Sequence, residues 1–228
     1  MGKLLINLKP NFVRNHIIKN EKTMPRSIFI VLDGIDGSGT STHSNLLAGF
    51  LSTKGLKIYL TQEPSNSDIG KLLRIYLKDD KIPASTDSLL FAADRVLHFE
   101  NEIKKKMEEG YIVISDRYIE SSIAYQSSQS EEITIEWVKN LNIFAGKPIL
   151  TIILDIDPKM SLARKQHKTL DKFEDTSMLD KVRQVYLTRA KKEEYDVVNT
   201  DDIIEIVQAK IQKIVLEKLK EIGFQIKN

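Results

Sequence analysis

A glycine-rich turn follows a short hydrophobic run near residue 30 and leads into a segment with helical periodicity. The run covers residues 28–32, Gly34 and Gly39 are separated by four residues, and Ser41 and Thr42 follow. This spacing matches G-x-x-x-x-G-K-[ST], in which a loop between a strand and a helix surrounds phosphates with backbone N–H groups. The feature therefore predicts an α/β fold built on a strand, a tight phosphate loop and a helix.

One position of this phosphate loop departs from the pattern. Thr40 stands where the pattern has a lysine, whose ammonium group reaches the terminal phosphates of ATP. Loss of one such electrostatic donor typically costs about 3 kcal/mol of transition-state stabilisation, so we expect another cation to replace it. The predicted phosphate-binding residues are Gly34, Gly37, Ser38, Gly39, Thr40, Ser41 and Thr42. The Ser41 hydroxyl is also a predicted Mg²⁺ ligand.

The composition fits a single enzyme domain with one full core. The chain has 228 residues, with 34 basic and 32 acidic side chains. This near balance of charge gives no support for a nucleic-acid partner, and none is expected. No apolar run approaches the ~20 residues that cross a bilayer, so no membrane association is expected either. The sequence has no cysteine, which excludes disulfides and fits a cytoplasmic protein.

Residues 1–23 differ from the rest of the chain. They carry five lysine or arginine residues against the single acid Glu21, and they precede Met24. A targeting peptide would need a long apolar stretch or a small-residue cleavage site, and neither is visible. We therefore interpret the segment as an N-terminal extension, either a short added element or sequence upstream of a true start at Met24.

Strand and helix patterns alternate from residue 28 onward. Strands are expected at 28–32, 57–61, 112–115, 149–154 and 197–198. Helices are expected at 41–54, 69–77, 85–109, 120–126, 134–144 and 202–222. One more helix is expected to begin at Pro158, and another to end at about residue 194. Right-handed crossovers between such strands give a P-loop NTPase-type parallel β-sheet with helices on both faces.

A charged segment at about 164–175 is the expected source of the replacement cation. It contains Arg164, Lys165, His167, Lys168 and Lys172. A basic run is usually a solvated face, but this one lies between a strand and a helix, where a mobile lid over ATP is expected. We predict that Arg164 and Lys172 act as catalytic cations. The predicted domain covers 24–228 and includes this lid segment.

Asp116 and Arg117 directly follow the expected strand at 112–115. Ligands in such folds bind at the carboxyl ends of the parallel strands. An arginine there can hold a phosphate with two hydrogen bonds and neutralise its charge during transfer, while Asp116 can hold Mg²⁺ directly or through water. A salt bridge between the two is disfavoured because neighbours in an extended segment point in opposite directions. Both residues are predicted to be catalytic.

Five motifs in register resemble those of the thymidylate kinase family. Besides the phosphate loop, they are Glu63–Pro64 with the helix after it, Phe91–Arg95 (FAxxR), Asp116–Gln126 (DRY…SS-x-AYQ) and Asp171–Glu174 (DRFE, with Lys172 for arginine). The resemblance covers about residues 28–219 and excludes residues 1–23. It implies an ATP-dependent kinase that converts dTMP to dTDP with Mg²⁺. It also implies a homodimer, because similar kinases are homodimers.

The resemblance further implies a role for each residue of a dTMP site. Phe91 would stack on thymine and Arg95 would bind its O4, although core packing is the better interpretation of Phe91 from the residues alone. Arg74 and Arg117 would bind the 5′-phosphate. Asp36 would lie near the 3′-hydroxyl and Glu63 would line the pocket. Ser122 and Gln126 would contact the base, and Tyr125 would crowd the 2′ position of a ribonucleotide.

Two departures from the family pattern leave alternatives open. Bacterial members often have arginine before the Glu-Pro pair, where this chain has Gln62, and the lysine of the phosphate loop is missing. Lysine in place of the lid arginine also lacks the planar fork of arginine. One alternative is a nucleoside monophosphate kinase of broader specificity that accepts dUMP or other nucleotides. Another is a nucleotide-binding protein with weak or lost catalysis, which only the missing lysine supports.

Overall fold

The computed structural model describes residues 28–79, 81–164 and 175–224. The expected N-terminal extension at 1–23 lies outside the described residues. Most of the predicted lid segment, including Lys172, also lies outside them.

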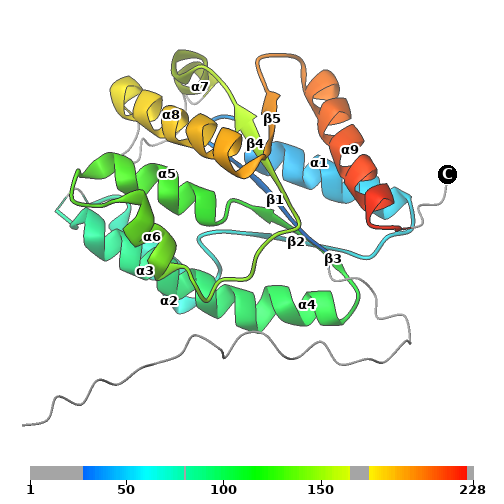
Figure 1. The fold of residues 1–228 in the computed structure, drawn as a ribbon, viewed down its shortest axis with the longest axis horizontal. Coiled ribbons are helices and arrows are strands. Elements are labelled where there is room, and N and C mark those ends of the chain that lie inside the picture. Colours follow the sequence, from blue (N-terminus) through cyan, green and yellow to red (C-terminus); the bar gives the residue numbers. More distant parts are fainter. Residues whose placement is uncertain (1–27, 80, 165–174, 225–228) are drawn as a thin grey trace, which may run out of the picture.

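A five-stranded parallel sheet forms the centre of the described residues (Figure 1). Its strands are β1 (Ile28–Gly34), β2 (Ile58–Gln62), β3 (Ile112–Asp116), β4 (Leu150–Asp155) and β5 (Asp196–Asn199). Their order in the sheet is β2-β3-β1-β4-β5, so β1 lies at the centre. All of β1 and β3 is buried, which explains why these strands read as continuous hydrophobic runs. The predicted parallel sheet is confirmed.

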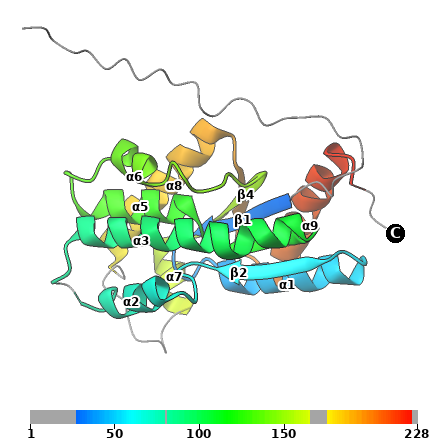
Figure 2. The same cartoon turned by 90° about the horizontal axis from the view of Figure 1, so that it is seen from below.

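Helices cover both faces of this sheet (Figures 1 and 2). On one face, α1 (Thr40–Thr53) and α9 (Ile204–Glu221) pack their buried leucine, isoleucine and valine side chains against the strands. On the other face lie α3 (Ala84–His98), α5 (Ile119–Gln129) and α8 (Thr176–Glu193). The remaining helices are α2 (Asp68–Tyr76), η1 (Phe99–Ile103), α4 (Lys104–Glu108), α6 (Ile135–Leu141) and α7 (Pro158–Arg164). No described helix is long and apolar enough to cross a membrane.

Two helices differ from the sequence prediction. The single helix expected at 85–109 contains a π-helical turn, η1, between α3 and α4. The Phe99 ring of this turn lies directly over Gly146, where a Cβ atom would approach it to 1.9 Å. The helix expected at 134–144 ends at Leu141, and the next side chain, Asn142, bonds to Arg95 and to the Val138 carbonyl instead. Both segments make a contact that is distant in the sequence, Phe99 with Gly146 and Asn142 with Arg95.

The strand order brings the chemically important segments to one edge of the sheet. Leu32 of β1 lies opposite Asp116 of β3, so the phosphate loop after β1 and the Asp116-Arg117 pair after β3 are neighbours. Gly34 at the end of β1 lies opposite Leu154 of β4. The carboxyl ends of the three central strands therefore meet at the loop, as the sheet geometry requires of a ligand site.

Candidate active site

The phosphate loop depends on glycine at two positions. Gly37 has a φ of 79° and Gly39 a φ of 96°, in the left-handed region that side chains disfavour. A Cβ atom on Gly37 would also lie 2.7 Å from the Ser161 carbonyl oxygen. Helix α1 begins at Thr40, so the loop ends at a helix N-terminus, where free N–H groups and the helix dipole favour anions.

A cavity of about 430 Å³ lies along this loop, and we call it the donor cavity. Its walls are Asp36, Gly37, Gly39, Thr40, Ser41, Thr42, His43, Arg117, Arg164, Thr200, Asp202 and Ile204. Five of the predicted phosphate-binding residues are thus in the wall. Gly34 and Ser38 are not: the Gly34 carbonyl accepts a hydrogen bond from Arg117, and Ser38 is fully buried beneath the loop.

Ser41 and Asp116, the two predicted metal ligands, lie next to each other. The Ser41 hydroxyl donates a hydrogen bond to Oδ2 of Asp116. The other carboxylate oxygen, Oδ1, is buried and has no hydrogen-bond partner among the described residues. Hydroxyl and carboxylate oxygens are the ligands that Mg²⁺ takes in phosphoryl-transfer sites, so this pair has the chemistry and the spare acceptor that a Mg²⁺ ion requires.

Arg117 has a strained backbone and a side chain bound by the phosphate loop. Its φ is 72°, which is unfavourable for a residue with a side chain. Nη1 donates to the Gly34 carbonyl at 2.8 Å, and Nη2 donates to Oδ1 of Asp36 at 2.6 Å. Burial disfavours the charged guanidinium, but nearby groups, led by Asp36, outweigh it and raise the pKa of Arg117 above its usual range.

A second cavity, of about 160 Å³, lies on the other side of Arg117, and we call it the acceptor cavity. Its walls are Asp36, Glu63, Pro64, Leu77, Phe91, Arg95, Arg117, Tyr118, Ser121, Ser122, Tyr125 and Gln126. All the residues predicted to bind dTMP are among them except Arg74. Asp36 and Arg117 belong to the walls of both cavities, so the two cavities meet at this ion pair.

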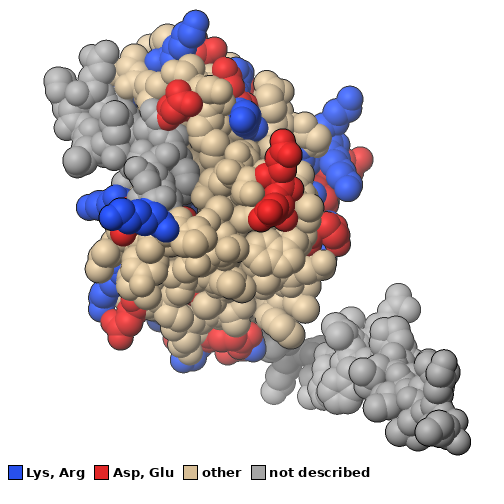
Figure 3. Space-filling view, turned by 90° about the vertical axis from the view of Figure 1, so that its left-hand side faces the viewer, with Lys and Arg blue, Asp and Glu red and all other residues tan. Residues whose placement is uncertain are grey.

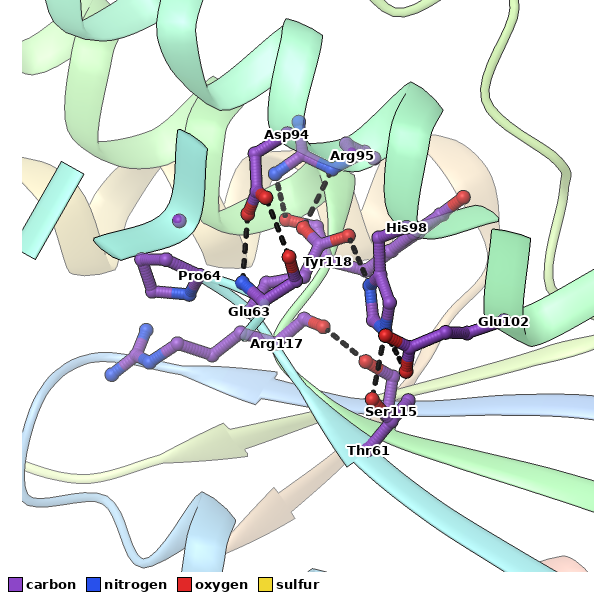
Figure 4. Close-up of polar contacts among 12 residues, drawn as sticks. Thr61, Glu63, Pro64, Asp94, Arg95, His98, Glu102, Ser115, Arg117 and Tyr118 are labelled. Carbon is purple, nitrogen blue, oxygen red and sulfur yellow. Dashed lines mark hydrogen bonds and ion pairs between the residues drawn. The ribbon is translucent and has the colours of Figure 1, made fainter. Parts of the chain in front are cut away.

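Arg95 is buried and almost fully hydrogen-bonded at the wall of the acceptor cavity (Figure 4). Nε donates to Oε2 of Glu63 at 2.8 Å, and Nη1 donates to Oδ1 of Asn142 at 2.6 Å. Nη2 donates to the Tyr118 carbonyl and to the Ser122 hydroxyl, at 3.1 and 2.9 Å. A guanidinium has five N–H donors, so one N–H of Nη1 is without a partner among the described residues. Arg95 is also one of the residues that line the acceptor cavity.

Comparison with known proteins identifies the family of this chain. Residues 32–211 match the family model described as thymidylate kinase. The chain belongs to the thymidylate kinase family. A probable thymidylate kinase of Pyrobaculum aerophilum is 44% identical over 189 residues, which cover 82% of this chain and 95% of the relative. A probable thymidylate kinase of Pyrococcus horikoshii is 40% identical over 203 residues, covering 85% and 98% of the two chains.

Arg74 takes a different position from the other residues that the thymidylate kinase motifs predict. Its two terminal nitrogens donate to the carbonyl oxygens of Ser65 and Pro64, in the loop that begins with the cis Glu63-Pro64 peptide. Asp94 holds the same loop by accepting hydrogen bonds from the Ser65 N–H and hydroxyl at 2.7 and 2.6 Å. Arg74 and Asp94 therefore fix the loop that carries Glu63.

Asp33 is a buried residue of this thymidylate kinase fold that the motif search did not single out. It accepts hydrogen bonds from the Ser121 hydroxyl at 2.6 Å, the Tyr186 hydroxyl at 2.7 Å and the Tyr118 N–H at 3.1 Å. Burial raises the pKa of Asp33, and the nearby Arg117 opposes the shift. The available sequence signal was an acid at the end of an otherwise apolar strand.

Arg164, the first residue of the predicted lid segment, reaches across the donor cavity. Nη2 donates to the Thr200 carbonyl at 2.7 Å, and Nη1 lies 3.4 Å from the Gly37 carbonyl. It thus links the phosphate loop to the loop between β5 and α9. His43 lies in the same wall, with Nδ1 2.8 Å from Oε1 of Gln208, and no sequence motif pointed to His43 or Gln208.

Proposed function

We propose that this chain transfers the γ-phosphoryl group of ATP to dTMP, giving ADP and dTDP. The observation that carries the proposal is that the donor and acceptor cavities share Asp36 and Arg117. ATP in one cavity and dTMP in the other would bring their phosphates together beside a guanidinium. Phosphoryl transfer depends mainly on such alignment and on charge neutralisation.

The chemistry requires no general base. The second pKa of a phosphate monoester is about 6, so the attacking oxygen of dTMP is already ionised at neutral pH. Arg117 would bind the phosphate of dTMP and neutralise negative charge as the phosphoryl group passes. The Asp36 carboxylate, which pairs with Arg117 at 2.6 Å, orients the guanidinium toward the junction of the cavities.

Ser41 and Asp116 are the residues that would hold Mg²⁺. The unpartnered Oδ1 of Asp116 beside the Ser41 hydroxyl supports this assignment. When bound, the ion supplies charge neutralisation at the phosphates of ATP.

The walls of the acceptor cavity support the base-recognition roles that we propose. Phe91 would stack on thymine, and Arg95 would donate its remaining N–H to O4. Ser122 and Gln126 would contact the base edge, and Tyr125 would pack against the sugar. Arg74 retains donors beyond its two loop contacts, and we propose that these help bind the 5′-phosphate.

An assay of ADP release with a panel of nucleoside monophosphates tests the proposed function. We expect a higher kcat/KM with dTMP than with purine monophosphates, because the Arg95 donor and the Phe91 wall fit a 4-keto pyrimidine, a feature that dUMP shares. Similar values for dTMP, dUMP and purine monophosphates would favour a broader nucleoside monophosphate kinase. ATP binding without ADP production for any acceptor would favour a nucleotide-binding protein that lacks catalysis.

We propose that Arg164 supplies the charge that Thr40 lacks, because its side chain lies over the donor cavity. Arg164→Ala is expected to lower kcat about a hundredfold, the effect of losing one preorganised charge, with a smaller change in dTMP affinity. Thr40→Lys should give little gain in the wild-type background and should recover part of the loss in Arg164→Ala. ADP release and dTMP titration measure both effects. An unchanged kcat in Arg164→Ala, or a large gain in Thr40→Lys alone, would contradict this assignment.

Further parts of the proposal concern assembly, partners and location. Helices α2 and α3 expose Leu72, Ile75, Leu89 and Leu97, which is the kind of apolar surface expected at a homodimer contact. Figure 3 shows basic and acidic side chains interspersed on one face of the described residues, without the continuous basic stripe expected of a nucleic-acid site. A cytoplasmic location stays a prediction.

A further inference from the structure

A fully buried histidine lies behind the base-binding end of the acceptor cavity. His98 is on α3, one turn after Arg95, and Figure 4 shows it between Glu63 and Thr61. Its Nδ1 lies 3.3 Å from Oε1 of Glu63, and its Nε2 lies 2.7 Å from the Thr61 hydroxyl. It is not among the residues that line either cavity.

The partner of Nδ1 shows that this nitrogen of the His98 ring carries a proton. A carboxylate can only accept hydrogen bonds, so the Nδ1 that faces Glu63 carries a proton. Nε2 has the Thr61 hydroxyl as its hydrogen-bond partner. Oε2 of Glu102 is 3.7 Å from Nε2 and accepts a hydrogen bond from the Tyr59 hydroxyl at 2.9 Å, so a second carboxylate lies on the outer side of the ring.

The two oxygens of Glu63 are divided between Arg95 and His98. Oε2 accepts from Nε of Arg95 at 2.8 Å, while Oε1 faces His98. Both side chains of the Glu63–Arg95 pair are almost completely buried, so the carboxylate has few other groups to bind. His98 therefore restrains the rotation of the carboxylate that orients the Arg95 guanidinium.

We propose that His98 is a positioning residue for the acceptor base. It holds Glu63 against Arg95, so that the one remaining N–H of Arg95 meets a carbonyl at position 4 of the pyrimidine. This inference rests on the proposed function, in which dTMP occupies the acceptor cavity. It assigns a role to a residue that touches neither substrate.

The group at position 4 of the pyrimidine ring allows the role of His98 to be tested by comparing dTMP with dCMP. Thymine has a carbonyl oxygen there, which accepts the Arg95 donor, whereas cytosine has an amino group, which places donor against donor. Glu63 also lines the cavity, so without His98 its carboxylate is free to turn and accept from a cytosine amine. Loss of His98 should therefore reduce the preference for dTMP over dCMP, and not only the affinity for dTMP.

Three substitutions of His98 distinguish the contributions of its two ring nitrogens. Asparagine places an amide nitrogen near the position of Nδ1, glutamine places one near Nε2, and leucine replaces both. His98→Asn should retain the contact to Glu63, whereas His98→Gln and His98→Leu should lose it. Thr61→Val is the matched control, because it removes the partner of Nε2 and leaves Glu63 in place.

Calorimetric titration of the full chain with dTMP and with dCMP is the test. For His98→Gln and His98→Leu we expect dTMP binding about tenfold weaker, as for a lost hydrogen bond to a charged group, and a dTMP:dCMP affinity ratio reduced by a similar factor. His98→Asn and Thr61→Val should stay within about threefold of wild type on both measures. If His98→Asn behaves like His98→Gln, or if the affinity ratio is unchanged in all variants, His98 does not position the base site.

Equilibrium binding separates this inference from the proposed function. A wild-type chain that binds dTMP but releases no ADP overturns the kinase proposal and still gives the affinity ratios. A wild-type chain that binds no dTMP overturns both. ATP binding and melting temperature, measured on every variant, identify general unfolding. If His98→Leu does not fold, the comparison of His98→Asn with His98→Gln decides the matter.

Discussion

Arg117→Ala is expected to reduce kcat by at least about a thousandfold. Arginines that stabilise the transferring phosphoryl group contribute factors of about 10³–10⁵. The Arg117 guanidinium lies between the two cavities, and its pKa is raised, so it carries its charge throughout the pH range of the reaction. Its loss also removes the 2.6 Å ion pair to Asp36. Steady-state ADP release at saturating ATP and dTMP measures the effect.

Two further variants make this result specific. Arg117→Lys should retain only part of the activity, because lysine keeps the charge but not the planar fork that bonds both Gly34 and Asp36. Arg183→Ala is a matched control: Arg183 pairs with Asp155 at 2.6 Å and lines neither cavity, so its kcat should stay near wild type. An Arg117→Ala enzyme with kcat within about tenfold of wild type would exclude a direct role in transfer.

Arg95→Leu is expected to abolish measurable dTMP binding and to destabilise the fold by about 3–5 kcal/mol. The side chain is only 1% exposed and pairs with Glu63, so its removal leaves the buried carboxylate with His98 as its one remaining partner among the described contacts. It also leaves Asn142 and the Tyr118 carbonyl without their donor. Chemical denaturation gives the free energy of unfolding, and calorimetry gives the affinity.

A double-mutant cycle distinguishes the two effects of Arg95. Replacing both partners, in Arg95→Leu with Glu63→Leu, removes the unpaired charge and should recover much of the lost stability. It should not recover dTMP binding, because the donor to the base is still absent. If the double variant binds dTMP, or if the single variant keeps wild-type stability, the described role of the Glu63–Arg95 pair is wrong.

The sheet could be predicted well from the sequence because the patterns that indicate its strands are local. A buried parallel strand reads as a hydrophobic run, and the glycine spacing after residue 32 defines the loop and the helix that follows. The residues of the acceptor cavity were predicted from the resemblance to thymidylate kinases. From the residues alone, Phe91 was better interpreted as core, yet it lies in the cavity wall. Periodicity predicts which side chains share one face of a helix, but not which residues or cavity that face meets in the folded protein.

The polar partners of the site could not be predicted because they are distant in the sequence. Asp33 and Tyr186 are 153 positions apart, and Arg95 and Asn142 are 47 apart. Each pair forms only when helices on one face of the sheet are packed. The contact of Phe99, in the π-helical turn after His98, with Gly146 is another example. Local propensity contains no information about such contacts.

The backbone of Arg117 has a consequence for improving the stability of this protein. A φ of 72° costs a side-chain-bearing residue of the order of 1 kcal/mol, and glycine or asparagine at that position would relieve the strain. The same side chain supplies an ion pair to Asp36 and hydrogen bonds to Gly34 and Ser121, and losing these contacts outweighs a strain of this size. The unfavourable φ therefore marks position 117 as one that stability engineering should leave unchanged.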